Sequence, residues 1–498
     1  MALTGHYLTR AQILLLSRQG AEEQAWASFR AGGWEAREDP EALLLKARLL
    51  KDAAVRAVGK ERQRLFVSAA AAYAAAARGR STYALINAAS LSALGNDRDL
   101  ASQRAREVLA MLQRADHEPD TPYWLGATRA EALLLLGQVA AAERALAEAI
   151  AGAPHAWEDH AITLRQFTLL LQHIEADCSW LDAYRPGPVM HFSGVMGIDP
   201  DDPIAARHIS SSVQAVRPSS GFGALAAGAD ILVAEALLSC GGDLHVVLPT
   251  DPETFRAESV TAFGAAWGSR FEDLLGRAAS VEVTSPARHL SQPSVEYADQ
   301  IAMGMAIGRA SALATRPVAI RILGKDGAKR RPEADLLWTS AAFDISVVEV
   351  SRSSAGTTRL ATAGDDQLIC LLAVCGHGRV MAEAAGGRRI NLPQEGCDLF
   401  AYERMCDAIG AARNLLTNSG SRAGLDFRIV SELPGPADLA PAVAAAQSTD
   451  AGSIAATRRA AIVARLHCPD ASADLAGEVR TAFGVEEIWR LLATGRGF

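Results

Sequence analysis

Glycines and one carboxylate gather at the start of GFGALAAGADILVAEALLSCGGDLHVVLP, the stretch from Gly221 to Pro249. Gly221, Gly223 and Gly228 precede an apolar helix, and Asp230 lies in the first turn of that helix. Glycine permits positive φ and close approach to the backbone, and a helix N-terminus presents unpaired N–H donors. We favour a ligand-binding turn here; the alternative is a turn that only packs a helix on a strand.

Other polar residues follow expected strands. Ser193 and Gly194 end the strand in RPGPVMHFSG, and Thr250 follows the strand LHVVLP. Because ligands of open parallel sheets bind outside the carboxyl ends of the strands, these residues join the candidate site. A carboxylate in the first helical turn repels a phosphate placed on that turn. Asp230 is therefore expected to meet a ribose hydroxyl or an amine, or to serve only as a helix-stabilising charge.

The remaining candidates have weaker support. A basic cluster follows the strand PVAIRIL and could neutralise a phosphate or simply be solvated; it consists of Lys325, Lys329, Arg330 and Arg331. Arg207 and His208 are expected on a helix surface, whereas His191 and His245 alternate with apolar residues and are expected to be packed inside strands. The sequence contains no nucleophile elbow, His-Glu-x-x-His motif or phosphate-binding GxxxxGK[ST] loop.

Strand-like and helix-like segments alternate between residues 185 and 352, where apolar strands such as PVAIRIL and FDISVVEVS flank amphipathic helices. This alternation requires right-handed crossovers and a parallel sheet covered on both faces. We expect a doubly wound, Rossmann-like domain at 185–352. The small, polar segment 352–367 is expected to be a linker.

Residues 1–176 have scarcely a strand-like segment, and apolar residues recur at helical spacing. Two helix pairs, starting at Thr82 and at Pro122, share an aromatic start, a Leu-Gly step and a second amphipathic helix. They resemble degenerate tetratricopeptide-type (TPR) repeats, which implies a solenoid that binds a protein partner. An irregular helical bundle is the alternative.

Residues 366–498 are expected to form a third domain, of the α+β class. Its expected elements are the strands LICLLAVC, GCDLFAYE and LDFRIVSEL, a helix at 404–418 and a terminal helical stretch. The fold class expected for the whole chain is thus multidomain: an N-terminal helical repeat, a central Rossmann-like parallel sheet and a C-terminal α+β, ferredoxin-like domain.

HFSG followed by GFGALAAGADILVAEALLSCGGDLHVVLPTD, together with EYADQIAMGMAIGRASALATRPVAIRIL, resembles the Rossmann-like SLOG superfamily. This superfamily includes LOG-type cytokinin-activating phosphoribohydrolases and the DNA-processing protein A fold, and its members bind nucleotides or nucleotide-derived ligands as enzymes or sensors. The resemblance covers about residues 188–350. It implies ligand contacts for Ser193, Gly194, Gly221, Gly223, Gly228, Asp230 and Glu235. The Pro-Gly-Gly-x-Gly-Thr loop of the hydrolase branch is absent, which argues against phosphoribohydrolase activity.

The C-terminal third resembles a class III nucleotide cyclase domain, which some bacterial proteins combine with TPR-like repeats and a SLOG-like region. Such cyclases hold two metal ions with two carboxylates. The aligned positions here are Ala373 and Gly396, and the expected Asn and Arg fall near Arg458 and Ile462. The resemblance therefore implies a degenerate cyclase without metal ions.

Two acids lie close to the second aligned position. Glu395 and Asp398 could substitute for the missing carboxylate, but the strand LICLLAVC supplies no first ligand. We therefore expect no cyclic-nucleotide synthesis.

Composition and charge exclude several classes. The formal net charge is −8, so a nucleic acid would meet no global basic field. The seven cysteines are scattered without a CxxC pair, which predicts reduced thiols, a cytoplasmic location and no structural zinc. No apolar run reaches membrane-spanning length, and the N-terminus lacks the cleavage site of a signal peptide.

Together these features predict a cytoplasmic signalling or sensor protein without a cofactor. It would bind a small, nucleotide-derived ligand in the Rossmann-like domain and a protein partner through the repeats, with no nucleic-acid or membrane partner. The alternatives are a nucleotide-processing enzyme of the hydrolase or glycosidase type and an interaction scaffold with a vestigial pocket.

Overall fold

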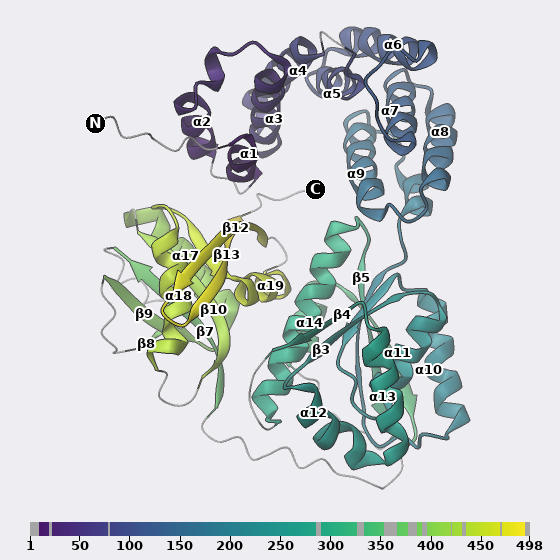
Figure 1. Cartoon of the computed structure of the whole chain (residues 1–498), viewed down its shortest axis with the longest axis vertical. Helices are drawn as coiled ribbons and strands as arrows, with labels where there is room; N and C mark the ends of the chain where they lie inside the picture. Colours follow the sequence, from purple (N-terminus) through teal and green to yellow (C-terminus); the bar gives the residue numbers. More distant parts are fainter. Residues whose placement is uncertain are drawn as a thin grey trace. The chain divides into compact units, whose positions relative to one another are not determined.

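The computed structural model describes residues 9–18, 22–77, 80–284, 290–325, 333–352, 366–376, 386–390, 396–419, 421–430, 435–468 and 471–493. The chain forms two compact units, Met1–Arg185 and Pro186–Phe498. The first consists of helices, and the second contains two β-sheets with their covering helices (Figure 1).

The first unit confirms the predicted helical N-terminal part. Its α-helices are α1 (Arg10–Arg18), α2 (Glu22–Ala31), α3 (Pro40–Arg56), α4 (Gly59–Ala76), α5 (Thr82–Leu94), α6 (Arg98–Arg114), α7 (Pro122–Leu135), α8 (Val139–Gly152) and α9 (Trp157–His173). Two short 3-10 helices, η1 (Trp34–Ala36) and η2 (Ser179–Tyr184), complete it. The helices begin where the sequence provides caps: Ser81 and Thr121 each accept a backbone N–H, and Pro122 occupies the first turn of α7.

Polar side chains connect the first helices of successive pairs in the first unit. Lys51 of α3 donates from Nζ to Oδ1 of Asn87 on α5 over 3.1 Å. Glu131 of α7 accepts from Ser90 Oγ of α5 at 2.5 Å and from Gln166 Nε2 of α9 at 3.0 Å. These bonds hold α3, α5, α7 and α9 in contact, as in a stack of helix pairs.

The second unit begins with the predicted parallel sheet. Its strands are β1 (Val189–Gly194), β2 (Ser220–Gly223), β3 (Asp243–Leu248), β4 (Ser280–Val283), β5 (Pro317–Gly324) and β6 (Asp344–Val350). All pair in parallel, in the order β4-β3-β2-β1-β5-β6. The first strand, β1, is therefore central in this sheet. The strands β2, β3 and β4 follow on one side of it, and β5 and β6 lie on the other side.

Helices cover both faces of this sheet, as the apolar strands require. The helices are α10 (Pro203–Val216), α11 (Ala229–Ser239), α12 (Pro252–Phe255), α13 (Ala265–Arg277), α14 (Gln292–Ala312) and α15 (Glu333–Ser340). Two further short segments are a π-helix, η3 (Arg256–Val260), and a 3-10 helix, η4 (Thr261–Phe263). One apolar core joins α10, α11 and α13 to the sheet, and α14 packs across β1, β2 and β3.

A second, mixed sheet follows, in the order β12-β13-β11-β10-β7-β9-β8. Its strands are β7 (Gln367–Cys375), β8 (Arg388–Ile390), β9 (Cys397–Tyr402), β10 (Arg422–Val430), β11 (Ile454–Thr457), β12 (Ala471–Thr481) and β13 (Gly484–Ala493). Its helices are α17 (Met405–Ser419), α18 (Pro436–Ser448) and α19 (Arg458–His467). The α+β character predicted for this part is confirmed.

The predicted terminal helical stretch is wrong for its last part, where β12 and β13 form an antiparallel hairpin. Their sequences, ASADLAGEVRT and GVEEIWRLLA, contain many residues that favour helices. Pairing of β13 with β11 extends the sheet and overrides that local preference.

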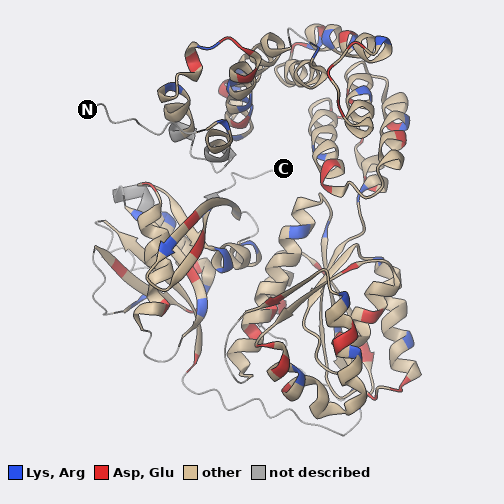
Figure 2. Cartoon of the chain, in the orientation of Figure 1, with Lys and Arg blue, Asp and Glu red and all other residues tan. Residues whose placement is uncertain are grey.

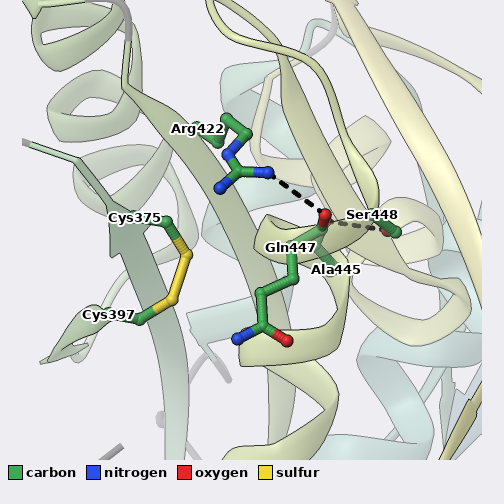
Figure 3. The surroundings of a disulfide bond; sticks show 6 residues. All are labelled: Cys375, Cys397, Arg422, Ala445, Gln447 and Ser448. Carbon is green, nitrogen blue, oxygen red and sulfur yellow. Dashed lines mark hydrogen bonds between the residues drawn. A yellow bond between two sulfur atoms is a disulfide. The ribbon is translucent and has the colours of Figure 1, made fainter. Parts of the chain in front are cut away.

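The prediction that all cysteines are reduced is also wrong in this structure. Cys375 and Cys397 form a disulfide across the β7–β9 ladder, where they are register partners with Cα atoms 4.4 Å apart (Figure 3). The sequence pattern did not indicate this pair, because the two cysteines are separated by 22 residues and only strand pairing brings them together. The other five cysteines are not part of a disulfide.

The two sheets of the second unit are joined through α14 and α19. Tyr297 of α14 donates its hydroxyl to the Phe427 carbonyl at 2.9 Å, and Arg458 of α19 forms a bidentate pair with Glu282 of β4 at 2.6 and 2.9 Å. Residues 186–498, predicted as two domains, thus cluster as one compact unit. None of the helices described here is both long and apolar enough to cross a membrane.

Candidate functional site

A cavity of about 290 Å³ lies at the carboxyl ends of β1, β2 and β3. The strand order reverses at β1, which has β2 on one side and β5 on the other, and ligands of open parallel sheets bind at such a reversal. We call it the switch-point cavity. Its lining residues are Phe192, Ser193, Gly194, Met196, Gly223, Ala224, Ala226, Asp230, Val247, Pro249, Phe255, Ser259, Gln292, Val295, Ala298, Asp299 and Ala302.

Asp230 is the most unusual group in this cavity. Gly228, at a φ of 102°, starts α11 and places Asp230 in the first turn, where its side chain is almost fully buried. One carboxylate oxygen accepts the Ala226 N–H at 3.2 Å. The other, Oδ1, is buried and meets no hydrogen-bond partner among the described residues.

Burial raises the pKa of Asp230 to about 8, and the charge of Asp299 acts in the same direction. The hydrogen bond from the Ala226 N–H, the charge of Arg321 and the nearby Gly194 N–H, which does not form a hydrogen bond of normal geometry, oppose this shift. Asp230 is therefore largely a protonated acid at neutral pH and can donate a hydrogen bond.

Asp299, on α14, is the second carboxylate of the cavity and stays ionised. Burial disfavours its charge, but the His191 side chain and the Arg321 guanidinium outweigh burial and lower its pKa. His191 Nε2 of β1 lies 3.1 Å from Asp299 Oδ1. Burial lowers the pKa of His191 itself, and the charge of Asp299 opposes this shift.

A second ion pair, Arg321–Asp335, acts electrostatically on His191 and Asp299. Arg321 of β5 is nearly buried and contacts Asp335 of α15 over 2.6 Å between Nε and Oδ1. The Trp338 ring lies 6.1 Å from the His191 ring. His191 was expected to be packed inside a strand, and it is fully buried, but it also contacts a cavity carboxylate.

The structure brings Ser193, Gly194, Gly223 and Asp230 together in the cavity lining. The glycines are also required for packing. A Cβ at Gly194 would lie 2.4 Å from the Ala229 Cβ, and a Cβ at Gly223 would lie 2.5 Å from the Phe192 carbonyl oxygen. At Gly194 and Gly223, a role in ligand binding and a role in packing are therefore compatible.

The other predicted ligand residues do not line the cavity. Gly221 faces Leu237, because a Cβ there would lie 2.6 Å from Leu237 Cδ2. Glu235 forms a bidentate pair with Arg270 at 2.7 and 2.5 Å. Thr250 is fully buried after β3 and donates to the Asp251 carboxylate at 3.3 Å.

The weaker candidates lie elsewhere. Arg207 and His208 are exposed on α10, as expected, and Lys325 is exposed after β5. Lys329, Arg330 and Arg331 lie outside the described residues. His245 stacks on Phe222, with ring centroids 4.4 Å apart.

Asp299 and its neighbour His191 belong to the candidate site, although the sequence analysis did not assign them to it. One signal was present: Asp299 interrupts a helix face otherwise formed by Val295, Ala302 and Ala306, at the spacing of one or two turns. A carboxylate on an apolar helix face requires a buried partner or a ligand. Identifying the partner required the fold, because β1 and α14 are far apart in sequence.

The positions aligned with cyclase metal ligands do not form a metal site in the described residues. Ala373 is fully buried in an apolar cluster with Leu371 and Leu439. Asp398, the possible substitute, pairs with Arg389 at 3.1 Å, and Glu395 lies outside the described residues. Within the described ranges, no group of three or more His, Cys, Asp or Glu side chains could hold a metal ion.

Arg458 and Ile462, near the remaining aligned cyclase positions, contact the first sheet's elements instead. Arg458 pairs with Glu282, and the Ile462 carbonyl lies 2.4 Å from where a Gly304 Cβ would be. No family model and no curated protein matches the chain, so its function has to follow from the geometry of the site.

Proposed function

We propose that the switch-point cavity binds a nucleotide-derived small molecule and that the chain acts as a sensor or signalling protein. The observation that carries this proposal is the buried Oδ1 of Asp230, which meets no partner among the described residues. A buried polar atom without a hydrogen bond costs about 1–3 kcal/mol. A ligand group that accepts a hydrogen bond at this position, such as a ribose hydroxyl, would recover that cost.

The chemistry of the lining supports a sugar or base as the bound group. Its polar side chains are Ser193, Asp230, Gln292 and Asp299, besides Ser259, and no Lys or Arg is among the described lining residues. Hydroxyl, amide and carboxyl groups recognise the hydroxyls and amines of a nucleoside, whereas a phosphate would meet the negative charge of Asp299. A cavity of about 290 Å³ is also small, which suits the nucleoside part of a ligand.

The partner and cyclase parts of the proposal rest on the other elements. We propose that the stacked helix pairs of Met1–Arg185 bind a protein partner. The side-chain hydrogen bonds that connect α3, α5, α7 and α9 support this proposal, because they hold successive helix pairs in a stack. We also propose that the second mixed sheet is a catalytically inactive, cyclase-like module, supported by the apolar surroundings of Ala373.

One observation favours an enzyme as the second candidate. Asp230 and Asp299 line one cavity, and their environments shift their pKa values in opposite directions. A protonated and an ionised carboxyl in one site are the pair that hydrolysis of a glycosidic bond uses. The alternative function is therefore hydrolysis of a nucleotide-type substrate.

Mass spectrometry of small molecules released from purified, heat-denatured protein tests the proposal. We expect a nucleoside or nucleotide derivative at close to one molecule per chain, and its loss from an Asp230→Ala variant that keeps the wild-type circular dichroism. Incubation of that molecule with fresh protein separates the two candidates: an intact molecule supports a sensor, and a released free base supports the hydrolase.

A further inference from the structure

A second cavity lies between the two sheets of the second unit. Gly304 and Gly308, one turn apart on α14, let α19 approach closely: a Cβ at Gly304 would lie 2.4 Å from the Ile462 carbonyl oxygen. Beside this crossing is a cavity of about 490 Å³, which we call the seam cavity. Its volume is in the range of small-molecule sites, about 300–1,000 Å³.

Aromatic rings from both sheets line the seam cavity. Phe222 of β2 and His245 of β3 stack with an interplanar angle of 7°, and Ser280 of β4 contacts His245 Nδ1 at 2.7 Å. Trp489 of β13 lines the cavity from the second sheet. Flat rings of this kind favour a planar aromatic ligand, which can stack on them in an offset arrangement.

The charged residues that line the seam cavity in the described part of the chain are basic. Arg309 of α14 and Arg465 of α19 line it, and no Asp or Glu is among its described lining residues. Arg465 donates from Nη2 to the Ala473 carbonyl at 3.1 Å, which orients its guanidinium. Burial lowers the pKa of His245, with Asp243 and Arg309 acting on it in opposite directions, so the ring is neutral.

This local charge differs from the rest of the chain. Acidic and basic residues are mixed along most of the ribbon (Figure 2), and the formal net charge is −8. Two guanidiniums beside aromatic walls favour an anionic group, to which Arg can donate two hydrogen bonds.

We propose that the seam cavity is a second binding site, for a planar aromatic molecule that carries a phosphate or another anionic group. The site is separate from the switch-point cavity, and the two cavities share no lining residue. Both use α14: Val295 and Asp299 line the first cavity, and Met305 and Arg309 line the second. An occupant of the seam cavity would contact both sheets.

Calorimetry of the full-length chain tests this proposal with 1-naphthyl phosphate and its uncharged counterpart, 1-naphthol. We expect 1-naphthyl phosphate to bind at least about tenfold more tightly than 1-naphthol. Arg309→Gln and Trp489→Leu should each weaken binding by about tenfold or more. Arg316→Gln is the matched control, because Arg316 pairs with Asp344 on the exposed edge of the sheet and does not line the cavity.

Three results would overturn the proposal: no binding of 1-naphthyl phosphate at millimolar concentration, equal affinity for 1-naphthol, or an unchanged affinity in both cavity variants. Thermal melts show whether Trp489→Leu is folded, and Arg309→Gln decides the matter if it is not. Titration with AMP shows whether the ligand of the seam cavity is a nucleotide or another aromatic anion. AMP binding that is lost in Arg309→Gln but kept in Asp230→Ala assigns nucleotides to this cavity, whereas binding of naphthyl phosphate alone assigns other aromatic anions.

Discussion

Asp230 and Asp299 line one cavity from two helices, yet the pKa of Asp230 is raised to about 8 while the pKa of Asp299 is lowered. The cause is their different surroundings. Burial acts on both, but only Asp299 contacts His191, and its charge in turn raises the pKa of Asp230. The site thus contains one acid that can donate and one that can accept, which is the basis of the proposed ligand recognition.

The raised pKa of Asp230 predicts how stability depends on pH. The folded protein keeps a proton that the unfolded chain releases above the ordinary value of 3.8. This contribution to stability is complete below that value and is lost as the pH rises toward 8, by up to about 1.4 kcal/mol per pH unit. Asp230→Asn does not titrate, so its stability relative to wild type should rise between pH 5 and pH 8.

Urea melts of both proteins at pH 5, 6.5 and 8 measure this difference. Asp201→Asn, which changes an exposed acid outside the cavity, is the control and should follow the wild type. Parallel pH profiles for wild type and Asp230→Asn would show that Asp230 is ionised throughout, contrary to its assignment as a donor.

The glycines of β2 should differ in their tolerance of a methyl group. At Gly223 a Cβ would lie 2.5 Å from a backbone oxygen, whereas at Gly221 it would meet the flexible end of Leu237 at 2.6 Å. We expect Gly223→Ala to destabilise the protein by about 2–3 kcal/mol and Gly221→Ala by about 1 kcal/mol or less. Chemical denaturation of the two variants checks this order, and equal losses would contradict it.

The end of the first unit is set by η2. Leu181 is fully buried, and Trp180 packs edge-on against Phe167 with ring centroids 6.2 Å apart. A fragment of residues 1–185 should therefore be folded and strongly helical, and a fragment ending at Cys178 should be less stable by about 2–3 kcal/mol. Circular dichroism during urea titration measures both. Equal stability of the two fragments would mean that η2 adds nothing to the helical core.

The second sheet should make no cyclic nucleotide. Two-metal catalysis requires carboxylates at the metal ions, and Ala373 is buried among apolar residues while Asp398 is paired with Arg389. Incubation with ATP or GTP and Mg²⁺ or Mn²⁺, followed by mass spectrometry, should detect no cyclic product. Turnover that disappears in Asp398→Ala would refute this prediction and assign the module to the active cyclases.

Local sequence patterns were sufficient to predict most of the helices and strands. Alternating apolar strands and capped helices predicted the parallel sheet, because strands such as β1, β3 and β5 are bounded by glycine or proline. The hairpin of β12 and β13 was missed because its residues favour a helix locally, and pairing with β11 decides its conformation. The disulfide was missed for the same reason, since strand register alone brings Cys375 to Cys397.

The candidate site was predictable only in part. Ser193, Gly194, Gly223 and Asp230 lie at strand ends or helix starts, which a sequence pattern locates. Asp299 enters the cavity from the first half of α14, and its partner His191 belongs to the first strand of the sheet. Contacts between such distant segments follow from the tertiary fold and leave no local pattern.

The most direct test of the central claim is calorimetry of the full-length chain with adenosine, guanosine, cytidine, uridine and their 5′-monophosphates. We predict that at least one of them binds, that Asp230→Ala weakens this binding about tenfold or more, and that Asp201→Ala leaves it within about twofold. The account would be contradicted if none of these compounds bound at millimolar concentration, or if a folded Asp230→Ala variant bound its ligand as tightly as the wild type.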